Sequence, residues 1–136
     1  MDIRAQFLQG MSCAANTVNV VTTDGAAGRA GVTVSAMASV SADGDAPTML
    51  VCVHHLAAAA QTILDNGCFC TNILRDDQSF ISDTFAGRLK TEDGDKFSCV
   101  DWVAMKTGAP RVRDPLTAFD CKVKSSERVG THFVFI

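Results

Sequence analysis

The 136-residue chain contains no tyrosine, one tryptophan and only three histidines. A tyrosine hydroxyl is therefore excluded as a proton donor in any reaction that the protein carries out. No apolar run reaches the roughly 20 residues of a membrane-spanning helix, and the N-terminus lacks the apolar core of a signal peptide. We therefore expect a cytoplasmic protein that does not enter a membrane. The net charge of −3 is spread along the chain, so we expect no nucleic-acid partner.

Two groups of potentially reactive side chains have simpler interpretations. Cys68 and Cys70 share one face of a predicted strand near His54-His55, which makes a zinc or haem site conceivable. Zinc sites usually combine two closely spaced ligand pairs, and the chain has no second pair, so we predict no metal and two buried thiols. All six cysteines are expected to be thiols, because the cytoplasm is reducing. The acidic residues around Asp93 and Asp95 lie in a polar stretch, 88–101, that predicts a solvated surface loop.

Hydrophobic periodicity predicts a mainly β chain with short helices. One helix is expected from Asp2 to Ala15, with the apolar residues Ile3, Phe7, Leu8 and Met11 on one face. Two more are expected at about 57–66, ended by Gly67, and from about Asp76 to Gly87. β-branched, apolar or alternating stretches predict strands; these are 17–23, 49–53, 68–74, 118–124 and 131–136. We predict one domain, 1–136, folded as a small antiparallel barrel with short peripheral helices.

Residues 32–41 alternate cleanly between apolar and mostly hydroxyl-bearing side chains. Val32, Val34, Ala36, Ala38 and Val40 fall on one face, which predicts a single strand with a polar opposite face. A flat flavin ring needs small side chains that let backbone N–H groups approach it, and its phosphate needs hydroxyls, amides or a cation. This stretch offers small residues and hydroxyls. The same pattern is also typical of the solvated face of an ordinary sheet.

Four segments, taken in order, resemble a known family. Gly31-Val32-Thr33-Val34-Ser35-Ala36-Met37-Ala38-Ser39-Val40-Ser41 resembles the G-M-T-V-S-A-F-T-S-V-S segment of the flavin reductase family, whose fold is the FMN-binding split barrel. Residues 69–74 resemble its F-x-V-N-V-L segment, Phe85-Ala86-Gly87 its F-A-G, and Gly130-Thr131-His132 its G-D-H. Because the matches are ordered along nearly the whole chain, the set is more specific than any one motif.

The resemblance implies an NAD(P)H-dependent flavin reductase. Such an enzyme transfers hydride from NADH or NADPH to FMN or FAD, and the reduced flavin passes to a partner monooxygenase. The protein supplies orientation and proximity, and the step needs no acid–base residue. The resemblance further implies a homodimer with flavin near the interface, and a chain that lacks the last C-terminal strand or strands of the family.

The matching positions also imply a site. The ring runs along Thr33–Ala36, largely through main chain, the phosphate lies after Val53, and Phe85–Gly87 lie close to the cofactor. His132 is the candidate catalytic residue, near flavin and nicotinamide. The predicted cofactor-binding residues are Thr33, Val34, Ser35, Ala36, Ser39, Ser41, Cys52, Val53, His54, His55, Phe85, Ala86 and Gly87.

One segment departs from the family pattern. Where the family reads N-R-x-S-x-T after Val53, this chain has His54-His55 followed by Leu56 and four alanines. Either the two histidines or the amides that open the following helix can take over phosphate binding. The departure keeps other functions open: a flavin- or haem-binding barrel without turnover, a degenerate reductase paralogue, or an interaction barrel with no ligand.

Overall fold

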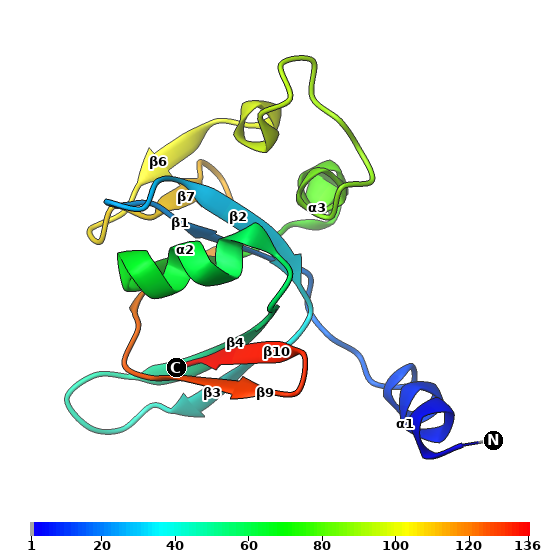
Figure 1. The fold of residues 1–136 in the computed structure, drawn as a ribbon. Coiled ribbons are helices and arrows are strands. Elements are labelled where there is room, and N and C mark those ends of the chain that lie inside the picture. Colours follow the sequence, from blue (N-terminus) through cyan, green and yellow to red (C-terminus); the bar gives the residue numbers. More distant parts are fainter. Residues whose placement is uncertain (1) are drawn as a thin grey trace.

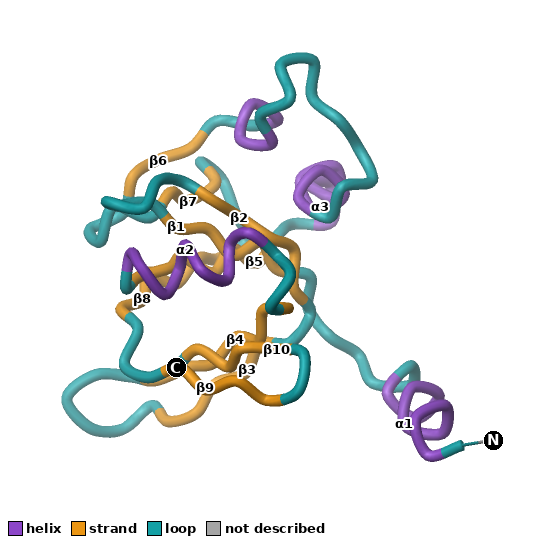
Figure 2. Tube along the Cα trace, viewed as in Figure 1, coloured by secondary structure: helices purple, strands orange, loops and turns teal. Residues whose placement is uncertain are grey.

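Two four-stranded antiparallel sheets form the body of the protein (Figures 1 and 2). The computed structural model describes residues 2–136. The first sheet has the order β2 (Ala30–Val34), β1 (Asn19–Thr23), β5 (Cys68–Ile73), β8 (Thr117–Lys122). The second has the order β3 (Met37–Ser41), β4 (Thr48–His54), β10 (His132–Phe135), β9 (Ser126–Val129), and β6 (Trp102–Ala104) pairs with β7 (Pro110–Val112). The predicted fold class, an antiparallel split β-barrel with short helices, is confirmed.

The main core lies between the two sheets and is covered by α2 (Ala58–Asn66) (Figure 1). Val21 and Phe69 enter it from the first sheet, and Val53 and Phe135 from the second, while α2 contributes Ile63. The helix ends at Gly67, whose φ of 71° is the left-handed conformation that glycine adopts without strain. The predicted helix and its glycine end are therefore confirmed. None of the helices in residues 2–136 combines the length and apolar character that crossing a membrane requires.

The prediction of one strand over residues 32–41 is wrong. The chain leaves the first sheet after Val34 and enters the second at Met37, so Ser35 and Ala36 form a corner between β2 and β3. The corner shifts the alternation by one residue: Val32 and Val34 pack on the core, and then Met37 does so instead of Ala36. Val40, assigned to the apolar face, is 52% exposed. Closing two sheets around one core requires such a corner, and alternation alone does not reveal it.

Two other predictions need correction. The first helix, α1 (Ile3–Met11), is shorter than the predicted 2–15, and none of its side chains, those of the predicted apolar face included, is buried. The strands β6, β7 and β9, of three or four residues each, were not predicted.

A second core holds the short helix α3 (Ser79–Phe85) against β1 and β2. Phe85 is 2% exposed and meets the rings of Phe97 and Trp102 edge to face, with centroids 5.0 and 5.6 Å away. Gly31 allows this approach, since a Cβ there would lie 2.6 Å from Cε1 of Phe85. The glycine of β2 therefore positions α3, which follows the 3-10 turn Asp76–Gln78.

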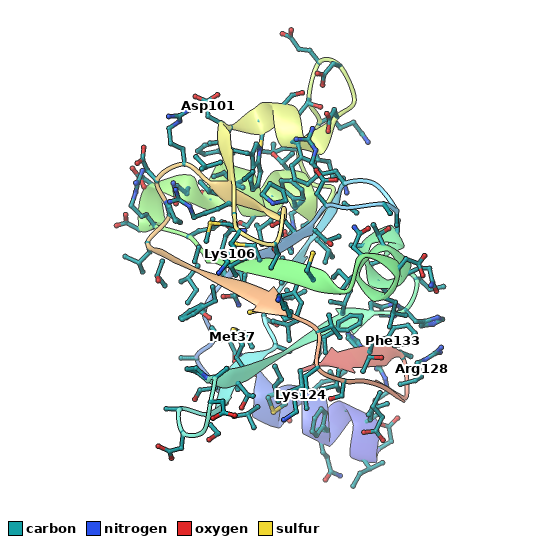
Figure 3. All side chains as sticks on the ribbon, turned by 90° about the vertical axis from the view of Figure 1, so that its left-hand side faces the viewer. Met37, Asp101, Lys106, Lys124, Arg128 and Phe133 are labelled. Carbon is teal, nitrogen blue, oxygen red and sulfur yellow. The ribbon has the colours of Figure 1, made fainter. Side chains whose placement is uncertain are left out.

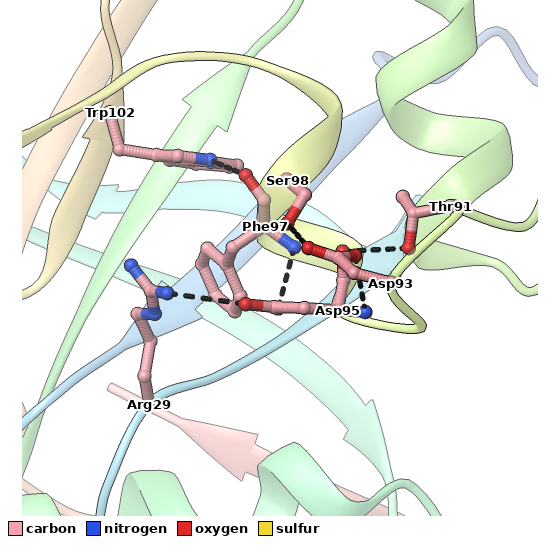
Figure 4. Close-up of polar contacts among 7 residues, drawn as sticks. All are labelled: Arg29, Thr91, Asp93, Asp95, Phe97, Ser98 and Trp102. Carbon is pink, nitrogen blue, oxygen red and sulfur yellow. Dashed lines mark hydrogen bonds and ion pairs between the residues drawn. The ribbon is translucent and has the colours of Figure 1, made fainter.

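The loop that follows α3 is held by its own carboxylates (Figure 4). Asp95 accepts a hydrogen bond from the Phe97 N–H at 3.0 Å and pairs with Arg29 at 3.5 Å. Asp93 accepts from the Ser98 hydroxyl at 2.5 Å, and this bond, with one from the Asp95 N–H, lowers the pKa of Asp93. The predicted surface loop is confirmed, although a 3-10 turn, Lys96–Cys99, anchors it through the buried Phe97. The carboxylates have a structural role here.

Candidate cofactor site

All three histidines of the chain meet at one end of the second sheet. His54 of β4 pairs with His132 of β10 across the antiparallel ladder, and their rings lie 5.0 Å apart at 71°. The ring of His55 stacks on that of His54, also at 5.0 Å and at 20°. The Leu56 N–H donates to Nδ1 of His54 at 3.0 Å, so neutral His54 carries its proton on Nε2. Three imidazoles therefore border one surface.

The electrostatics of this cluster favour a neutral His55. Partial desolvation lowers the pKa of His55, and the positive charges of Arg128, His54 and His132 lower it further. Each of these causes disfavours the imidazolium. An anion placed against the cluster would act in the opposite direction and draw a proton onto it.

The corner between β2 and β3 lies beside the same end of β4. The carbonyl of Ala36 accepts a hydrogen bond from the Cys52 N–H at 3.0 Å, and both Ser35 and Ala36 are exposed. The side chains of Val34 and Val53 point into the main core, so these two residues offer a ligand only their main chain. The Thr33 hydroxyl donates to the Ser82 carbonyl at 2.7 Å and so ties the corner to α3.

The structure thus brings together most of the predicted site, namely residues 33–36, residues 52–55 and His132. It does not bring Ser39 and Ser41 to the histidines. They pair with Met49 and Thr48 at the opposite end of β4, about 17–20 Å from His54 at the usual rise per strand residue. There they line a 720 Å³ groove between β3 and β8.

Only part of the predicted segment Phe85–Gly87 is accessible to a ligand. The Phe85 side chain is buried against Phe97 and Trp102, so it cannot touch a bound molecule. Ala86 and Gly87 are exposed where α3 ends. Any contribution of this segment to cofactor binding therefore comes from these two residues, chiefly through their backbone.

Sequence reasoning missed Arg128. It lies on β9, where its guanidinium donates to the Gly130 carbonyl at 2.7 Å and sits over the Phe133 ring at 5.7 Å (Figure 3). The β9–β10 hairpin turns at Gly130, with φ 57°, and carries this cation close enough to influence His55. Recognition of Gly130 as a hairpin turn would have found it, since the turn pairs residue 128 with Phe133.

Two of the cysteines lie in a small buried cluster. All six are free thiols, and Cys68 and Cys70 are buried beside Ala109, as predicted. Desolvation and the neighbouring Asp120 carboxylate raise the pKa of Cys70 to about 12, so it stays a protonated thiol. Across residues 2–136, the His, Cys, Asp and Glu side chains form no cluster of three or more that could hold a metal ion.

Comparison with known proteins places this geometry in a family. Residues 11–136 match the flavin reductase like domain. The FMN reductase (NADH) RutF of Enterobacter cloacae is 40% identical over 126 residues, which cover 93% of this chain and 74% of the relative. The crystal structure of a putative flavin reductase from Haemophilus somnus superposes with a TM-score of 0.86 at 36% identity, covering 99% of this chain and 83% of that one. BorF, the flavin reductase component of a bacterial two-component tryptophan halogenase, gives 0.80 at 31% identity, covering 96% and 81%. The chain belongs to the flavin reductase like domain family.

Proposed function

We propose that the protein reduces FMN with NADH. The observation that carries this function is the convergence of an exposed small-residue corner, Ser35–Ala36, with the histidine cluster at the end of β4. Such a corner suits a flat ring and such a cluster suits its phosphate. The choice of FMN and NADH over FAD and NADPH rests on relatives such as the RutF protein, which is named an FMN reductase (NADH).

We place the flavin ring along the corner. Ser35 and Ala36 are exposed and small, so a planar ring can approach their main chain without steric conflict. Thr33 holds the corner to α3 through Ser82, which fixes its position before a ligand arrives. Bound flavin supplies the hydride chemistry, and the protein contributes binding, orientation and proximity. No residue of the chain needs to donate or accept a proton at the reacting atoms.

We place the flavin phosphate at the histidines and at the start of α2. Ala57 precedes this nine-residue helix and provides no side-chain cap, so amides of its first turn remain available to an anion. His54 and His55 border the same turn, since the Ala57 N–H donates to the His54 carbonyl. This donor set can replace the hydroxyls and the arginine that the family pattern has here.

His132 faces His54 from β10, and we assign it a positioning contact with the flavin or nicotinamide ring. We also propose a homodimeric cytoplasmic enzyme that delivers reduced flavin to a flavin-dependent oxygenase. Support for the last point is that the similar protein BorF is the reductase component of a two-component system. The alternative, which the experiment must distinguish from a reductase, is a barrel that binds flavin without turnover.

The first test is oxidation of NADH and NADPH, followed through nicotinamide absorbance, with FMN, FAD or no flavin added. We expect NADH to be oxidised, when FMN is added, at a rate well above that without protein. Faster turnover with FAD or NADPH would correct the cofactor assignment. Folded protein that binds flavin but oxidises neither nucleotide would contradict the reductase assignment and leave a binding protein.

A second test follows the protonation of His55. Without ligand the pKa of His55 lies below the ordinary value of 6.5. The unfolded chain therefore binds a proton at His55 more readily than the folded chain does. As the pH falls through 6.5, protonation of His55 consequently lowers the stability of the folded state. We expect FMN to raise this pKa, because a phosphate stabilises the imidazolium, and riboflavin to leave it unchanged. Titration of the imidazole signals by NMR, with and without each flavin, measures both shifts. An equal shift with both flavins would contradict a phosphate contact.

A further inference from the structure

The helix α1 forms an arm whose apolar face is exposed. It stands apart from both sheets (Figures 1 and 2), and the apolar side chains that would form a core face are exposed: Ile3 by 84%, Phe7 by 66%, Leu8 by 49% and Met11 by 48%. The side chain of Asp2 caps its start, accepting from the Ala5 N–H at 2.7 Å. A nine-residue helix is nevertheless too short to be stable in water by itself. Its helical form therefore requires a surface on which the apolar face packs.

The groove between β3 and β8 is a surface of the right kind. Both strands are at the edges of their sheets, and the groove between them has a volume of 720 Å³ with Met37, Met49, Ile73 and Phe119 in its walls. Among the described lining residues the one charged side chain is Asp120, whose carboxylate accepts from the Thr107 N–H and hydroxyl at 3.1 and 2.5 Å. Because this carboxylate is already hydrogen-bonded to Thr107, the groove suits an apolar occupant.

We propose that α1 of one copy of the chain packs into the groove of a second copy, and that α1 of the second copy packs in the same way into the groove of the first. The inference deepens the homodimer proposed above and does not depend on reductase activity. Each chain carries one arm and one groove. A dimer with a two-fold axis therefore covers both arms and fills both grooves. The arm also leaves the body at the groove, because Ala15 and Thr17 line it.

The area is sufficient for a stable dimer. The four exposed side chains of one arm present roughly 400–500 Å², so two arms with the two grooves that they cover bury roughly 1,600–2,000 Å², a standard interface size. The exchange would also place Ser39 and Ser41, which line the groove, at the subunit boundary. The predicted cofactor role of these two residues would then involve a surface made by both chains.

The dimer dissociation constant tests the proposal. We compare Phe7→Asp, which puts a charge on the apolar face of the arm, with Gln9→Asp, which puts the same charge on the opposite face. Since α1 has no buried side chain, neither change disturbs the barrel. Analytical ultracentrifugation without flavin or NADH should give a dissociation constant at least tenfold higher for Phe7→Asp and within about twofold of the parent for Gln9→Asp. Equal values for the two variants, or a monomeric parent, would overturn the proposal.

Cross-linking identifies the surface that the arm contacts. A photoreactive benzoylphenylalanine replaces Phe7, and unlabelled protein is mixed with heavy-isotope-labelled protein before irradiation. We expect peptides that join position 7 of one isotopic form to the Met37 or Phe119 region of the other. Cross-links confined to single chains would show that the arm folds back on its own groove, and cross-links to a different surface would exclude the groove. Either result would overturn the exchange while leaving the NADH oxidation assay free to decide the enzyme assignment.

Discussion

Replacing Phe85 with alanine should lower the free energy of unfolding by about 3–5 kcal/mol, the usual cost of removing a large ring from a packed core. The ring is 2% exposed and meets Phe97 and Trp102 edge to face. Removing it leaves a cavity beside Gly31, whose missing side chain had made room for it. Urea unfolding, followed by circular dichroism, measures the loss.

Phe80→Ala is the matched control. Phe80 belongs to the same helix but is 42% exposed, so the substitution makes the same change in helix propensity with little loss of packing. We expect it to cost about 1 kcal/mol or less. A similar cost for both variants would mean that α3 is held by something other than the aromatic cluster.

Replacing His54 and His55 together with alanine should weaken FMN binding by about 10- to 150-fold. The range corresponds to losing one charge-assisted hydrogen bond worth about 1.5–3 kcal/mol. The flavin ring site, at Ser35–Ala36, does not use these imidazoles, so turnover at saturating FMN should be largely retained. Fluorescence titration gives the dissociation constant, and steady-state kinetics give the turnover number.

Riboflavin, which has the ring but no phosphate, separates the two possible roles of the histidines. Its affinity should change little in the double variant, after unfolding curves confirm that the barrel is intact. An equal loss of affinity for riboflavin and FMN would mean that the histidines contact the flavin ring and not the phosphate. Undiminished FMN binding would mean that the first turn of α2 binds the phosphate without the help of His54 and His55.

Local features of the fold could be predicted from the sequence. The strands β1, β4, β5, β8 and β10 were expected from their β-branched, apolar or alternating residues, and α2 with its end at Gly67 was expected from periodicity and glycine chemistry. Both signals depend on neighbours a few residues apart. The ordered motifs also predicted the family, which is confirmed, because together they extend over most of the chain.

The sequence-based predictions were less accurate where contacts with distant segments of the chain decide a residue's role. Phe85 matched a motif that lies close to a cofactor, yet its ring is buried, because Gly31 and the loop that carries Phe97 enclose it. The apolar residues of α1 were predicted to share one face of a helix, but no other part of the described residues buries that face. Periodicity indicates that a face needs a partner and does not identify the partner.

The sequence by itself determined several of the longer strands, the helix α2 and the family, since these follow from local pattern and from motifs in order. Tertiary structure alone decided the corner at Ser35–Ala36 and the meeting of His54 and His55 with His132. The physical reason is the same for both. Each depends on how β4 pairs with strands far away in the chain, and strand register is fixed by packing around the whole core.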